Sequence, residues 1–209
     1  MSDKKTGKAS QYLSDKDVTE AQHPLKTYLF FALVGSSILF LSLVFIYFIW
    51  LNHNFDSIVF QMPKSFIVST VVMITSSFTL SQSLKAFKND ETKQLLITLS
   101  LTFFLGILFT GLQIFGWKSL YEKGHFIDGE AGYAFLYVIT GLHFLHVVVG
   151  LFYLFYLCLK AFDNWNDPIK ALVYFSNSFE GLRIDLFTSY WHFVDIMWIV
   201  LFFTFLFTL

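Results

Sequence analysis

Five long segments of this chain contain almost no charged side chains. They cover residues 27–51, 66–84, 94–117, 132–159 and 188–209, and Asp195 is the one charged residue inside them; the other 28 of 29 lie outside. A helix on the surface of a soluble protein carries charges on its wet face. Each segment reaches or nearly reaches the ~20 residues that cross a bilayer. The pattern predicts an all-α polytopic membrane protein, a bundle of five transmembrane helices.

Other folds and protein classes fit this chain less well. Five such segments disfavour the buried core helices of a soluble protein. An outer-membrane barrel would alternate apolar and polar residues, which the run 39–46 (LFLSLVFI) does not do. Since Cys158 is the single cysteine and the net charge is -1, neither a disulfide scaffold nor a nucleic-acid binder is expected.

Lysine and arginine are unevenly divided between the two ends of the predicted helices. Eleven lie in the N-terminal segment and in the connections after the second and fourth helices, whereas three lie on the opposite side. Because short loops rich in these residues stay in the cytoplasm, we expect a cytoplasmic N-terminus and a C-terminus outside. Residues 1–26 are predicted to be a polar cytoplasmic arm without the apolar core of a secretory signal, and residues 27–209 the transmembrane domain.

Two segments differ from the rest in their polar content. Residues 160–187 are expected to form the longest internal loop, with a turn at 164–168 (NWNDP). The second apolar segment, 66–84, is rich in serine and threonine. These small hydroxyl residues let helices approach closely and bond to one another. A polar pathway through the membrane is the functional alternative for them.

A pair of histidines lies near the middle of the fourth apolar segment. His143 and His146 are three residues apart, so both rings lie on one helix face. Neutral imidazole is a common metal ligand, which raises the hypothesis of a metal or haem site. The alternative is a pair of buried histidines bonded to neighbouring helices. An isolated HxxH with no carboxylate nearby in its helix favours this second interpretation.

Three further polar residues are expensive to place in lipid. His192 and Asp195 share a face near the start of the last segment, and a charged Asp at a helix centre costs about 2.5 to 3.5 kcal/mol on insertion scales. These two residues could form a proton relay, contact a partner subunit, or lock together as a His–Asp pair. Gln113, in the third segment, is expected to bond to a neighbouring helix.

Three motifs resemble subunit III of the haem–copper terminal oxidases, the cytochrome c oxidase family. The most specific is 190–198 (YWHFVDIMW), which places Trp191, His192 and Asp195 in one membrane helix. The second is 140–150 (TGLHFLHVVVG), similar to the family pattern T-G-x-H-x-x-H-V-x-x-G. The third is 110–117 (TGLQIFGW), similar to L-x-Q-x-x-E-[YW]. The likeness extends from about residue 26 to 209, and five helices match the short bacterial form of the family.

At two positions the chain lacks a glutamate that the family pattern often has. Ser37 stands in the first segment, within 35–40 (GSSILF), where the family often has a glutamate. Gly116 stands in the third motif where a glutamate or another polar residue is common. Asp185, six residues before Trp191, takes the place of a family glutamate.

The resemblance implies an accessory role in an oxidase complex. Subunit III of the family carries no haem or copper, which reside in partner subunits. It packs on subunit I beside the entrance of a proton-uptake path, together with subunit II and other small subunits. It binds phospholipid between its helices and keeps the complex active over many turnovers. We therefore expect no catalytic, cofactor or metal residue in this chain, no nucleic-acid partner, and a location in the bacterial inner membrane.

The sequence leaves several other functions open. Related subunits occur in quinol oxidases and beside nitric oxide reductases. A membrane cytochrome would use His143, His146 and His192 as haem ligands. A small proton-coupled transporter would use His192 and Asp195. On the favoured interpretation, the seven candidate residues make structural, subunit or lipid contacts: Gln113, His143, His146, Asp185, Trp191, His192 and Asp195.

Overall fold

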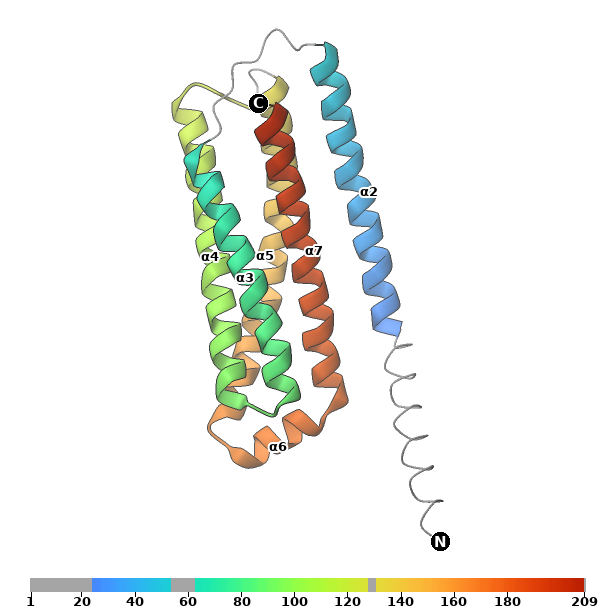
Figure 1. The fold of residues 1–209 in the computed structure, drawn as a ribbon, viewed down its shortest axis with the longest axis vertical. Coiled ribbons are helices and arrows are strands. Elements are labelled where there is room, and N and C mark those ends of the chain that lie inside the picture. The colour runs from blue at the N-terminus through green and yellow to red at the C-terminus, as the bar shows by residue number, and fades with distance from the viewer. Residues whose placement is uncertain (1–23, 54–62, 128–130, 209) are drawn as a thin grey trace.

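The computed structural model describes residues 24–53, 63–127 and 131–208, and these residues form helices joined by short turns (Figure 1). The helices are α2 (Pro24–His53), α3 (Lys64–Lys88), α4 (Thr92–Glu122), α5 (Ala131–Trp165), α6 (Pro168–Ser176) and α7 (Ser178–Thr208). Among the described residues, five helices (all but α6) are long and apolar enough to cross a membrane. The predicted all-helical bundle with five spans is confirmed.

The five long helices cover the five uncharged segments apart from Leu209, which lies outside the described residues, and they extend beyond most of the segment ends. α2 already begins at Pro24, so the last residues of the predicted polar arm are helical; the rest of the arm lies outside the described residues. α2 begins and α7 ends at opposite ends of the bundle (Figure 1). Which of these ends faces the cytoplasm stays a prediction. We call the end where α6 lies, and where α2 begins, the α6 end.

The expectation of a long loop at 160–187 is wrong. α5 continues to Trp165, α6 occupies Pro168–Ser176, and α7 begins at Ser178. The turn itself is present at residues 166–167, where the Asp167 side chain accepts hydrogen bonds from the backbone N–H groups of Ile169 and Lys170 and caps α6. Charge keeps this segment out of lipid but does not prevent a helix, because many charged residues are good helix formers.

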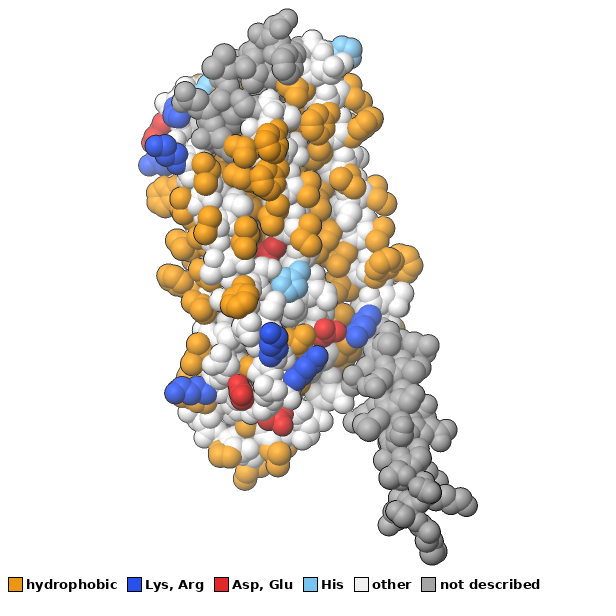
Figure 2. Space-filling model, in the orientation of Figure 1, with side chains coloured by type: hydrophobic (Ala, Val, Ile, Leu, Met, Phe, Trp, Pro, Cys, Tyr) orange, Lys and Arg blue, Asp and Glu red, His pale blue; other side chains and the backbone are white. Residues whose placement is uncertain are grey.

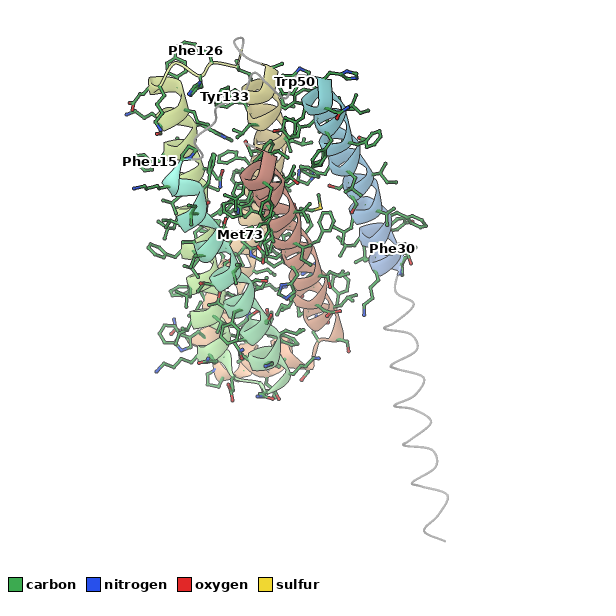
Figure 3. The ribbon with its side chains drawn as sticks, turned by 45° about the horizontal axis from the view of Figure 1, so that its top comes forward. Phe30, Trp50, Met73, Phe115, Phe126 and Tyr133 are labelled. Atoms are coloured by element: carbon green, nitrogen blue, oxygen red, sulfur yellow. The ribbon has the colours of Figure 1, made fainter. Side chains whose placement is uncertain are left out.

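The helices are not equally attached to one another. α3 and α4 share the most extensive contact, and α5 and α7 pack against this pair, whereas α2 contacts α7 and α5 at the side of the bundle. In Figure 3, Met73 of α3 points into the bundle, while Phe30 of α2 and Phe115 of α4 point outward. Met73 is fully buried, and the two phenylalanines are among the exposed apolar residues that a membrane helix presents to lipid.

Two glycines let α7 approach its neighbours closely. A Cβ added to Gly106 of α4 or Gly150 of α5 would lie 3.2 or 3.1 Å from the ring of Trp191. The Trp191 indole is fully buried. It fits between the helices because Gly106 and Gly150 have no side chain at the two points where the ring contacts α4 and α5. Trp191 is thus the residue at which α4, α5 and α7 meet.

Candidate functional site: a polar seam along α3

Hydroxyl groups of α3 accept hydrogen bonds from side chains of α4 and α7. Trp191 Nε1 donates to Ser76 Oγ at 3.1 Å, and Trp198 Nε1 donates to Thr70 Oγ1 at 3.0 Å. Gln113 Nε2 donates to Ser69 Oγ at 3.0 Å. Each of these hydroxyls donates its own proton to a carbonyl of α3, so each is left free to accept. The predicted use of the serine-rich helix for close packing is confirmed.

His192 bonds to α3 through both nitrogens of its ring. Nδ1 lies 2.6 Å from Ser77 Oγ, and Nε2 lies 3.1 Å from Ser81 Oγ. Ser81 donates its proton to the Ser77 carbonyl, so Ser81 must accept from Nε2–H. A neutral ring then accepts the Ser77 proton at Nδ1. This tautomer follows from the hydrogen-bond network.

The predicted alternative of a locked His192–Asp195 pair is not found. Side chains of a helix lean toward its N-terminus, and the His192 ring reaches α3 at Ser77 and Ser81 rather than the next turn of α7. Asp195 is buried, and neither of its carboxyl oxygens has a hydrogen-bond partner among the described residues. Ser77, which bonds to the His192 ring, is also a polar neighbour of the Asp195 carboxyl. Sharing a helix face therefore did not make them partners.

The two histidines of α5 lie in different surroundings. His146 Nδ1 donates to the Leu142 carbonyl at 2.8 Å, which leaves Nε2 to accept from Ser36 of α2 at 3.2 Å. His143 is buried among aromatic rings, the nearest being Trp198 with ring centroids 5.2 Å apart. His143 Nε2 has no partner in the described part of the chain. The pair therefore acts in two places: His146 ties α2 to α5, and His143 fills the core.

A metal-binding group of three His, Cys, Asp or Glu residues does not occur among residues 24–53, 63–127 and 131–208. Of the three histidines that the cytochrome hypothesis requires, His146 and His192 have both ring nitrogens in hydrogen bonds with protein. A haem could bind them only if these bonds were broken. The observed arrangement uses the histidines to join helices.

Asp185 lies away from this seam, near the α6 end. Its carboxylate pairs with Lys26 of α2 at 3.4 Å, and both side chains are about two-fifths exposed. Because the pair is accessible, its contribution to stability is small. Asp185 thus clamps the start of α2 to α7 and takes no part in the buried network.

Sequence reasoning missed one ionic cluster at the α6 end. Glu180 Oε1 accepts from Lys160 at 2.6 Å and from Arg183 at 3.0 Å, and the Glu180 side chain is 6% exposed. Burial, with a smaller contribution from the nearby Glu180, raises the pKa of Tyr174 in the same region. The i,i+3 spacing of Glu180 and Arg183 was the available signal, but it has that meaning only inside a helix, and the segment was expected to be a loop.

Comparison with known proteins decides the family. The family model described as cytochrome c oxidase subunit III matches residues 17–208. The chain belongs to the cytochrome c oxidase subunit III family. This match covers all five long helices, including the three motifs on which the resemblance rests.

Several curated subunit III proteins are similar to the chain. It is 27% identical over 143 residues to cytochrome c oxidase subunit 3 of Bacillus sp. PS3, covering 68% of this chain and 64% of that protein. Identity to the carp (Cyprinus carpio) subunit 3 is 32% over 144 residues, covering 68% and 49%. Identity to a probable subunit 3 of Mycobacterium tuberculosis H37Rv is 31% over 133 residues, covering 64% and 61%. The matched region thus spans about half to two thirds of these relatives.

The two departures from the subunit III pattern have local structural explanations. Ser37 donates to the Leu33 carbonyl of its own helix at 2.8 Å, so it needs no polar partner elsewhere. At Gly116, an added Cβ would collide with the ring of Phe66, which packs edge-on against Trp198. A larger residue at 116 would displace Phe66, and the glycine therefore belongs with this aromatic cluster.

An apolar groove runs between α2, α5 and α7. It encloses about 250 Å³ and is lined by apolar and aromatic side chains and by one charged residue, Arg183. The lining residues are Leu29, Val149, Gly150, Tyr153, Arg183, Leu186, Phe187 and Tyr190. Arg183 lies toward the α6 end, close in sequence to the Asp185 that pairs with Lys26. The groove thus combines an apolar wall at membrane depth with a cation near its end.

Proposed function

We propose that this chain is the accessory subunit III of a proton-pumping haem–copper terminal oxidase in the inner membrane of a bacterium. It packs on subunit I, together with subunit II and other small subunits, and carries no redox centre of its own. The family match over residues 17–208 carries this proposal. The structure supports it because the polar groups inside the bundle mostly bond to one another and thereby join helices.

The role that fits this construction is to stabilise the complex during turnover and to support proton uptake. A bundle in which His192, Trp191 and Trp198 bond to α3 is a stiff scaffold rather than a site for chemistry. The complex would reduce oxygen with electrons received by other subunits. Assays of the purified complex with reduced cytochrome c and with a quinol identify the donor. A Soret band in the isolated chain would support the cytochrome alternative instead.

Depleting the chain from the purified complex tests the proposed role. The account predicts that oxygen reduction starts at a nearly normal rate and then decays faster with each turnover, and that adding the chain back restores the lifetime. Oxygen reduction that decays identically with and without the chain would contradict it.

The groove between α2, α5 and α7 is the proposed binding site for a phospholipid. One acyl chain would lie along Tyr153, Phe187 and Tyr190, and the phosphate would meet Arg183, which donates to the Tyr156 hydroxyl and to Glu180. Arginine recognises phosphate through several donors at once. Native mass spectrometry should show a retained phospholipid that is lost in Arg183→Gln, whereas Lys118→Gln, at the opposite end of the bundle, should retain it.

A further inference from the structure

Asp195 is a buried acid to which this chain offers no cation. Its side chain lies inside the membrane-spanning part of α7 and is buried, and both carboxyl oxygens are without a hydrogen-bond partner in the described part of the chain. Glu180 is buried to the same degree, but its carboxylate is held by Lys160 and Arg183. A buried carboxylate without such partners is so costly that the group takes up a proton instead. The two acids therefore call for different charge states.

The helices packed around α7 carry no charged side chain at the depth of Asp195. Their apolar segments, which contain none, are residues 27–51, 66–84, 94–117 and 132–159. On the face shown in Figure 2, the Lys and Arg side chains lie toward the two ends of the molecule, outside the apolar band. Among the titratable groups, His143 and His146 of α5 have other neighbours. His192 is the titratable group that shares a neighbour, Ser77, with Asp195.

Ser77 links the carboxyl of Asp195 to the ring of His192. The Ser77 hydroxyl donates to His192 Nδ1 at 2.6 Å, and its oxygen keeps lone pairs that can accept a proton from a protonated carboxyl. Beyond the ring, Nε2–H donates to Ser81 at 3.1 Å. A protonated Asp195 thus completes a row of donors that all point the same way. The row leads from a buried group to two half-buried ones, His192 and Ser81, which lie nearer the α6 end along their helices.

We propose that Asp195 is a proton-binding site within the membrane, which holds a proton at rest and exchanges it with His192 through Ser77. In the exchange, the Asp195 O–H bond breaks as Ser77 Oγ gains that proton, and the Ser77 O–H bond breaks as His192 Nδ1 gains the other. The products are a carboxylate and an imidazolium, so charge is conserved and no redox step is involved. The inference concerns side chains of this chain alone and stands apart from the proposed function.

Infrared spectroscopy detects the resting proton, because a protonated carboxyl has a C=O band that a carboxylate lacks. The full chain is purified from native membranes with the subunits that accompany it, and its spectrum at neutral pH is compared with that of Asp195→Asn. The variant should lose one carboxylic acid band. Asp163→Asn, at the accessible pair with Lys170, should lose carboxylate bands only. Isotopic labelling of aspartate in the wild-type chain must shift the same acid band. A spectrum in which Asp195 contributes carboxylate bands overturns the inference.

Deuterium exchange of the acid band tests the route through Ser77. Ser77→Ala removes the linking hydroxyl, so the exchange of the Asp195 proton should slow about tenfold or more. Thr75→Val is the matched control on the same helix, since the Thr75 hydroxyl bonds to a carbonyl of α3. It should leave the exchange rate within about twofold of the wild type. Equal rates in Ser77→Ala and Thr75→Val overturn the route. The proposed function fails separately, if the chain never copurifies with a haem-bearing partner.

Discussion

α7 and α2 are both apolar membrane helices, but they are attached to the bundle in different ways. α7 places Trp191, His192 and Trp198 in hydrogen bonds with α3, and most of these groups are buried. α2 buries only four residues, Phe40, Val44, Tyr47 and Leu51. Polar contacts to α5 and α7 join it near each end and near its middle: Lys26–Asp185, Ser36–His146 and Tyr47–Thr208. Hydropathy alone does not distinguish a central helix from a peripheral one; the placement of hydrogen-bonding groups does.

The largest effect is expected at the centre of the α7 contacts. Trp191→Ala would leave a cavity beside Gly106 and Gly150 and remove the donor to Ser76. We expect a loss of about 3 kcal/mol or more in the free energy of unfolding, measured by denaturation in detergent micelles. Phe207→Ala, 81% exposed on the same helix, is the control. If both variants unfold at the same denaturant concentration, α7 is not the central helix.

The next largest effect is expected in the ionic cluster of Glu180. Glu180→Gln removes the charge that pairs with Lys160 and Arg183, and because those cations are partly exposed we expect a loss of about 1–2 kcal/mol. Asp163→Asn, at the accessible pair with Lys170, should cost less than about 0.5 kcal/mol. Thermal unfolding of the two variants in the same detergent compares them. A larger effect at Asp163 would contradict the burial argument.

Two substitutions compare one hydrogen bond that holds α7 to the bundle with one hydrogen bond that holds α2. Thr70→Val leaves the buried Trp198 N–H without an acceptor, for an expected cost of about 1–2 kcal/mol. Ser36→Ala removes the α2 hydroxyl that bonds the part-buried His146, for about 0.5–1 kcal/mol. Chemical denaturation measures both. Equal losses of unfolding free energy in the two variants would show that burial does not make the bond that holds α7 stronger than the bond that holds α2.

The smallest effect on stability is expected where α2 is clamped at its start. Lys26→Ala breaks the accessible pair with Asp185 and should change the free energy of unfolding by less than about 0.5 kcal/mol. Its effect should appear as motion instead, since spin labels near the start of α2 would become more mobile than labels at Phe48. Unchanged mobility would mean that the clamp does not hold the helix.

Much of the fold follows from the sequence, and the reasons for its limits are physical. The uncharged segments locate five spans because lipid excludes charge over a known thickness. The helical nature of residues 160–187 did not follow, because outside lipid a charged segment can be loop or helix. The partners of His192 also did not follow. Spacing places His192 and Asp195 on one face, but side-chain direction and the position of α3 choose between Asp195 and the two serines.

The site was predictable to a similar extent. Gln113, Trp191 and His192 are all interhelical contacts, as polar groups in lipid should be. The two histidines of α5 could not be separated by sequence, because their different roles depend on Ser36 being beside His146 and on Trp198 being beside His143. The role of Gly116 required the position of Phe66 from another helix.

The central claim, that this chain is a subunit of a terminal oxidase, is tested most directly by purifying it from native membranes in mild detergent through an affinity tag. The absorption spectrum and the oxygen consumption of the eluate are then measured. The account predicts copurified haem in fixed proportion to the chain, together with oxygen reduction that is sensitive to cyanide. Elution of the chain without haem, while the oxidase activity stays in the unbound fraction, would contradict it.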